Sequence, residues 1–211
     1  MRSDLSIATA AAVERQLMMA HAFVIATKGG PMWSAVAATF DVLRALGLKV
    51  PSGRDFIERF ATTILALVAL PPMQLSPVQL VLLLTHEATH VAQWYADPAR
   101  MPIWYLQHRE KRASYEAGAI AQALAVQWAL TGELPANVEE LPSALAYGYD
   151  LGPEDVALAR AELEQEATAI AAGILPTGPA RTAIATVYRE QPDALDPRAL
   201  ELIRVNSPGV L

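Results

Sequence analysis

One short segment of the chain combines residues whose types and spacing are suited to hydrolysis. Residues 85–90 read Thr-His-Glu-Ala-Thr-His, which is the pattern HExxH. On a helix, His86 and His90 lie on one face and can bind one metal ion together. Glu87 is turned by about 100° round the helix from His86, where it can accept a proton from a metal-bound water. The pattern therefore predicts a hydrolase with His86 and His90 as zinc ligands and Glu87 as the general base.

A third zinc ligand must come from a carboxylate or from another histidine. The chain has four His, 22 Asp and Glu and no Cys, which excludes thiolate ligands, a thiol nucleophile and an iron–sulfur cluster. The metzincin spacing needs a histidine six residues after His90, but position 96 is alanine. Two glutamates remain on the next predicted helix, Glu110 and Glu116.

Glu116 is the better candidate of these two glutamates. It shares a helix face with apolar residues such as Ile120, and a carboxylate in that position is costly unless a positive charge meets it. A zinc ion would supply that charge, and the alternative is an ion pair with Arg112, one turn earlier. Glu110 lies in the charged segment 108–112, where water and neighbouring cations can satisfy it, so it is the fallback ligand.

Other polar residues are candidates for supporting roles. Gln93 follows the two histidines on the same face and could hold a ligand imidazole through its N–H, whereas Asp97 fits a helix-end cap better. His21 lies among apolar residues and is expected to be a packing or surface histidine. Acyl transfer usually needs a group that stabilises the oxyanion. The sequence offers five candidates without choosing among them: His108, Arg112, Tyr115, Tyr147 and Tyr149.

The motif lies inside a predicted helix with clear ends. Ser76 can cap this helix, Pro77 suits its first position, and Asp97 with the proline after it ends it. Residues 78–84 are apolar nearly all round the helix, which predicts a buried central element. The helix that carries Glu116 is expected to start between 102 and 110 and to end at 130.

The remaining elements are expected to be helical, with one exception. Thr62 to Val68 is rich in β-branched residues and is closed by two prolines, which predicts an edge strand. Further helices are expected over about 4–29, 32–46, 138–146, 153–172 and 180–190. The predicted fold class is mostly α (α+β), with a small edge strand or sheet beside the motif helix and a helical C-terminal extension.

The charge and hydropathy of the chain favour neither a nucleic-acid binder nor a membrane protein. Residues 1–130 hold 11 Lys and Arg against 9 Asp and Glu, while residues 131–211 hold 5 against 13. Neither part has a dense basic footprint, and the apolar runs are too short to span a membrane. No secretory signal is recognised at the N-terminus, so a cytoplasmic location is expected, with association with a virus particle left open. The oligomeric state is not predicted.

Together these features resemble the gluzincin type of zinc metallopeptidase. The resemblance rests on Ser76-Pro77, on the segment from His86 to Gln93 and, about 25 residues later, on Tyr115-Glu116 followed by Ala-Gly-Ala. It is strongest to small zincin-like proteins of bacterial and phage genomes, which often carry a glutamine three residues beyond the second histidine. It covers about residues 60–130.

The resemblance implies both an architecture and a set of roles. A zincin-like metal-binding domain is expected, which we extend to residues 1–135. Residues 136–211, which the resemblance does not cover, are expected to form an acidic helical subdomain packed on it. Zn²⁺ would be held by His86, His90 and Glu116, with Glu87 as general base and acid. In that family, a strand such as 62–68 lies antiparallel to a bound substrate.

Two functions from different classes fit this sequence. The first is a zinc-dependent peptidase that hydrolyses a peptide or protein substrate. The alternative is a zincin-fold structural or regulatory protein, for example a phage particle or host-regulatory component, that binds zinc without peptidase activity. The complete catalytic set favours the enzyme, because a purely structural zinc site has no use for Glu87.

Overall fold

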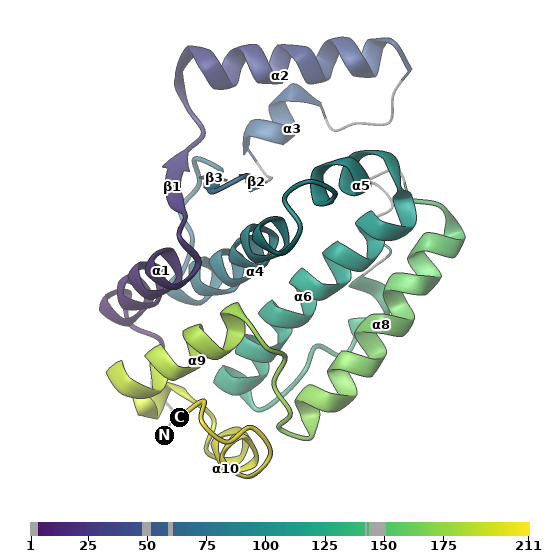
Figure 1. The fold of residues 1–211 in the computed structure, drawn as a ribbon. Helices are drawn as coiled ribbons and strands as arrows, with labels where there is room; N and C mark the ends of the chain where they lie inside the picture. Colours follow the sequence, from purple (N-terminus) through teal and green to yellow (C-terminus); the bar gives the residue numbers. More distant parts are fainter. Residues whose placement is uncertain (1–3, 48–51, 59–60, 142, 144–150) are drawn as a thin grey trace.

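The computed structural model describes residues 4–47, 52–58, 61–141, 143 and 151–211. In these residues the chain is mostly helical with one small mixed sheet, as the sequence predicts (Figure 1). In chain order the elements are α1 (Ile7–His21), β1 (Val24–Thr27), α2 (Gly30–Ala45), α3 (Gly53–Glu58), β2 (Thr62–Ile64), β3 (Leu67–Leu70), α4 (Pro77–Ala96), α5 (Met101–Gln107), α6 (Arg109–Thr131), η1 (Val138–Glu140), α8 (Pro153–Ala171), α9 (Pro179–Glu190), η2 (Pro192–Ala194) and α10 (Pro197–Asn206).

The sheet departs from the sequence prediction in two ways. The expected single strand over 62–68 is a hairpin of β2 and β3, because Leu65 adopts a left-handed conformation (φ 57°) and turns the chain. The expected first helix ends at His21, and β1 follows it in place of more helix. The strand order is β1-β3-β2, with β1 parallel and β2 antiparallel to β3, so β2 has no strand on its outer side among the described residues.

The motif helix α4 forms where the sequence places it. The side chain of Ser76 accepts a hydrogen bond from the backbone N–H of Gln79, and the Gln79 side chain accepts one from the N–H of Ser76. This reciprocal capping box fixes the start of the helix, with Pro77 in its first turn. Because the start of α4 is set locally, the positions of its two histidines on the helix are set as well.

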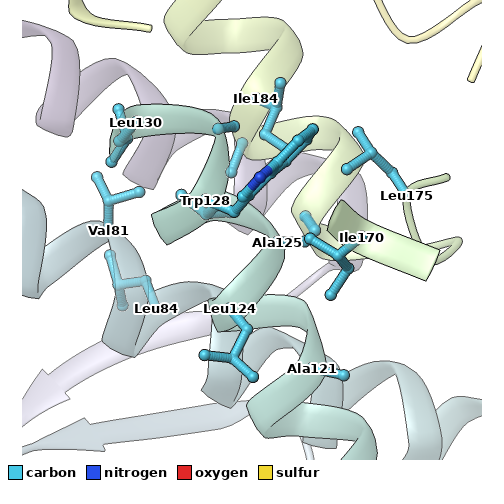
Figure 2. Close-up of a cluster of buried hydrophobic side chains, with 14 of the residues drawn as sticks. Val81, Leu84, Ala121, Leu124, Ala125, Trp128, Leu130, Ile170, Leu175 and Ile184 are labelled. Carbon is cyan, nitrogen blue, oxygen red and sulfur yellow. The ribbon is translucent and has the colours of Figure 1, made fainter. Parts of the chain in front are cut away.

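The central core lies between α4, α6 and the C-terminal helices. Val81 and Leu84 of α4 are fully buried, and Trp128 of α6 is 4% exposed. Figure 2 shows the Trp128 ring directed from α6 toward Ile184 of α9, with Ile170 of α8 nearby. The hydrophobic cluster therefore continues without a break from the motif helix into residues 136–211.

The helices after residue 150 pack on the N-terminal part of the chain. Figure 1 shows α6 between α4 and α8, with α9 beside α1 and the two ends of the chain close together. Gln191, just after α9, joins α9 to the start of α1 by accepting a hydrogen bond from the N–H of Ser6. A division of the chain at residue 135 stays a prediction. Of the helices described here, none has the length and apolar character to cross a membrane.

Candidate metal centre

Two neighbouring helices bring the predicted ligands to one point. His86 and His90 lie on α4, and Glu116 lies on α6, which packs against α4. The two Nε2 atoms are 3.2 Å apart. His86 Nε2 lies 3.6 Å from Glu116 Oε2, and His90 Nε2 lies 3.5 Å from Glu116 Oε1. These three side chains form the one group of potential metal ligands found among the described residues.

The spacing of these atoms is close to that of the ligands of a zinc ion. Zinc binds imidazole nitrogen and carboxylate oxygen at about 2.0–2.2 Å, so its ligand atoms lie about 3.3–3.6 Å from one another. The contacts of Glu116, Oε2 to His86 at 3.6 Å and Oε1 to His90 at 3.5 Å, fall in this range, and the 3.2 Å between the two Nε2 atoms lies just below it. Glu116 Oε2 is buried and has no hydrogen-bond partner among the described residues. A bound cation would satisfy this otherwise costly oxygen.

The burial of the cluster is graded. The side chain of Glu116 is 1% exposed and that of His90 is 9% exposed, whereas that of His86 is 19% exposed. The interior of the cluster is therefore shielded from water, and it meets solvent on the His86 side.

Electrostatics couple Glu116 to the two histidines. Burial alone would raise the pKa of Glu116, but the attraction of His90 and His86 outweighs it, and the pKa lies well below its usual range. Burial likewise opposes the charged form of His90, yet the carboxylates of Glu116 and Glu87 raise its pKa. Glu116 is thus ionised and placed to meet a positive charge, which either a metal ion or a proton on His90 can provide.

Gln93 orients one of the two histidines. Its Oε1 lies 2.9 Å from His90 Nδ1, and its Nε2 donates to the backbone carbonyl of Tyr115. With Nδ1–H donated to Gln93, the Nε2 atom of His90 faces His86 and Glu116. This contact lies where the sequence predicts a supporting residue, and it ties α4 to α6 one turn from the cluster.

Glu87 lies beside the cluster, held by the edge strand. It is 5% exposed, and the hydroxyl of Thr63 on β2 donates to its Oε2 over 2.6 Å. The negative charge of Glu87 helps to raise the pKa of His90, but Glu87 is not part of the ligand cluster found among the described residues. Its position agrees with a carboxylate that serves a water next to the cluster and does not complete the ligand set.

A buried lysine stands on the other side of this strand. Lys28 is 1% exposed, and its Nζ donates to the hydroxyl of Thr62 and to the carbonyl of Phe56, over whose ring it lies at 3.6 Å. Burial lowers the pKa of Lys28 to about 8, against the attraction of the Glu87 carboxylate. Neither Lys28 nor Thr63 is predicted from the sequence, since neither belongs to a recognisable motif.

Tyr105 is a third residue of the site that the sequence does not predict. It lies on α5, and its hydroxyl donates to Glu116 Oε1, the oxygen nearer His90. Its ring is edge-on to His90 at 6.0 Å and stacks on Tyr115 at 6.4 Å. An aromatic residue 11 positions before the candidate ligand gave no signal, because α5 is a separate short helix whose orientation only the fold determines.

The remaining predicted residues that the structure describes lie outside the ligand cluster. His108 and Glu110 are exposed at the start of α6, and Glu110 is not part of the ligand cluster. The Nε of Arg112 donates to the backbone carbonyl of Tyr105. Asp97 accepts a hydrogen bond from the N–H of Arg100, as a capping residue does.

Three further predicted residues are His21, Tyr147 and Tyr149. His21 ends α1, and its Nε2 is buried without a hydrogen-bond partner among the described residues, so burial lowers its pKa. This agrees with a packing histidine. The oxyanion candidates Tyr147 and Tyr149 lie outside the described residues.

Comparisons with protein-family models, with curated proteins and with solved structures find no match to this chain. The case for a function therefore rests on the residues of the site and on their geometry.

Proposed function

We propose that the protein is a zinc-dependent peptidase whose metal ligands are His86, His90 and Glu116. The observation that carries the proposal is the convergence of three buried or half-buried side chains, whose potential ligand atoms lie 3.2–3.6 Å from one another, close to the spacing of zinc ligands. A purely structural site would normally be closed by four protein ligands, whereas three ligands leave a position open for water or substrate.

The chain supplies a base next to that open position. Glu87 is buried and directly follows His86 on the helix. Its Oε2 accepts the hydrogen bond from Thr63, so Oε1 is the carboxylate oxygen that remains for proton transfer. When bound, zinc would act as a Lewis acid toward a water and a carbonyl oxygen. Glu87 would take the proton of the attacking water and return it to the leaving amine. Peptide hydrolysis needs these two transfers.

The position of the edge strand supports a peptide as the substrate. β2 runs next to the active-site helix, and its outer side has no strand partner among the described residues. An extended peptide can add to such an edge through main-chain hydrogen bonds. Its scissile carbonyl would then lie near Glu87, because Thr63 of the same strand touches that side chain.

The change Glu87→Gln tests this proposal. It keeps the size of the side chain and removes the base, so cleavage of a broad peptide library should fall by about 10²–10⁴-fold while zinc content stays at about one ion per chain. Glu110→Gln, the same change at an exposed glutamate on α6, is the matched control and should leave both quantities unchanged.

Three results would contradict the proposal. Activity that persists in Glu87→Gln would exclude this residue as the base. Zinc content that persists in His86→Ala with His90→Ala would exclude the site. A zinc-loaded wild-type protein that cleaves no peptide would favour the zinc-binding structural or regulatory function.

A further inference from the structure

The edge strand and the catalytic carboxylate are joined by one short hydrogen bond. Thr63 Oγ1 lies 2.6 Å from Glu87 Oε2 and 3.4 Å from the backbone oxygen of Glu87. The shorter distance belongs to the carboxylate, and a hydroxyl that donates to an ionised oxygen forms one of the stronger hydrogen bonds in proteins. The side chain of Glu87 is therefore tied to β2 through the hydroxyl of Thr63.

The position of Thr63 is itself fixed from the other face of the strand. Successive side chains of a strand point to opposite faces, so Thr62 and Thr63 turn in opposite directions. Thr62 accepts a hydrogen bond from the buried ammonium of Lys28 over 2.7 Å, while Thr63 donates to Glu87. The buried ammonium of Lys28 thus contacts Thr62 on one face of β2, and the buried carboxylate of Glu87 contacts Thr63 on the other face.

We propose that Thr63 is a positioning residue that holds the Glu87 carboxylate in the orientation required of the base. This inference rests on the proposed peptidase function and names a residue for it outside the HExxH segment. A carboxylate with one oxygen fixed by Thr63 presents its other oxygen, Oε1, for proton transfer in one orientation. Because β2 is also the strand that a peptide would join, the base and the substrate would share one support.

The first test measures the contact without any activity. Thr63→Val keeps the shape of the side chain and removes the hydroxyl, and Glu87→Ala removes the acceptor. In a double-mutant cycle on the metal-free protein, unfolded with denaturant, the two changes should be coupled by about tenfold or more in the unfolding equilibrium constant. Thr62→Val, the same change one residue earlier, is the matched control and should show at most about twofold coupling to Glu87→Ala.

The second test separates positioning from stability. In the zinc-loaded protein, Thr63→Val should lower kcat for peptide cleavage at least tenfold, with zinc content and KM within about twofold of wild type. Thr63→Ser restores a hydroxyl and should recover most of kcat. A general weakening of the strand would not be rescued in this way.

The outcomes distinguish this inference from the proposed function. Coupling of less than about twofold between Thr63 and Glu87, or a fully active Thr63→Val variant, would overturn the role of Thr63 and leave the peptidase proposal intact. A wild-type protein that binds zinc and cleaves nothing would contradict the peptidase function. In that case the double-mutant cycle alone decides whether Thr63 holds Glu87.

Discussion

Individual residues differ in how far their type alone indicates a role. His86 and His90 are marked by their spacing, since residues four apart on a helix must share a face. Glu116 is marked by a conflict, because a carboxylate on an apolar face needs a positive partner. The structure resolves that conflict by placing Glu116 against both histidines at 3.5–3.6 Å.

The supporting residues carry no such mark in the sequence. Thr63, Lys28 and Tyr105 are ordinary residue types in a strand, after a strand and in a short helix. Each reaches the site through a contact between two different elements, over 24 positions for Thr63 and Glu87 and over 11 positions for Tyr105 and Glu116. A pattern within one element cannot report a contact between two.

The choice between the two glutamates gives a prediction at this scale. Glu116→Ala should weaken zinc binding by more than about 100-fold, because removing a ligand costs more than removing one of its hydrogen-bond partners. Glu110→Ala removes an exposed side chain outside the ligand cluster and should leave zinc affinity within about twofold of wild type. Competition with a chelator of known affinity measures both. A larger loss in Glu110→Ala would reverse the assignment.

At the scale of elements, the sequence was informative for the helices that carry the ligands, whereas α10 was not predicted although Asp196 caps it. The capping box at Ser76 and the left-handed Gly132 (φ 77°) after α6 bound the two helices that carry the ligands. The sheet was harder to predict, because Leu65 turns the chain where a glycine or asparagine would normally be expected. β1 was missed for a related reason, since α1 ends at Ala22 in a left-handed conformation without glycine.

The buried lysine beside β2 predicts a pH dependence of stability. Burial lowers the pKa of Lys28 to about 8, below its ordinary value of 10.5. Between these two pH values the unfolded chain keeps a proton that the folded protein has lost, so the free energy of unfolding should rise with pH. The rise should approach about 3 kcal/mol in total, at about 1.4 kcal/mol for each pKa unit.

Denaturant unfolding at several pH values between 7 and 10.5 would measure this rise. Lys28→Met removes the titrating group and should abolish the rise, while Lys111→Met, at an exposed lysine on α6, should keep it. A slope that is the same in wild type and Lys28→Met would show that the ammonium of Lys28 is not penalised in the folded state.

At the scale of the whole molecule, the remaining question is whether the chain folds as one unit or two. A boundary near residue 135 is suggested by the change in charge along the sequence, from a slight excess of cations to a clear excess of acids. The packing of the core indicates one unit instead. Buried residues of α4 and α6 and buried residues of α8, α9 and α10 belong to one continuous hydrophobic cluster.

Trp128 tests this question because its ring joins the two parts (Figure 2). Trp128→Ala should lower the free energy of unfolding by about 3–5 kcal/mol, as expected for a large aromatic side chain removed from a core. Because the core is shared, the metal site and the C-terminal helices should still unfold together, in one transition shifted to lower denaturant. Trp104→Ala, the same change at a partly exposed residue of α5, should cost much less.

Zinc release and far-UV circular dichroism, followed along the same denaturant series, measure the two events separately. Two resolved transitions, with zinc lost in only one of them, would show that residues 1–135 and 136–211 are independent folding units.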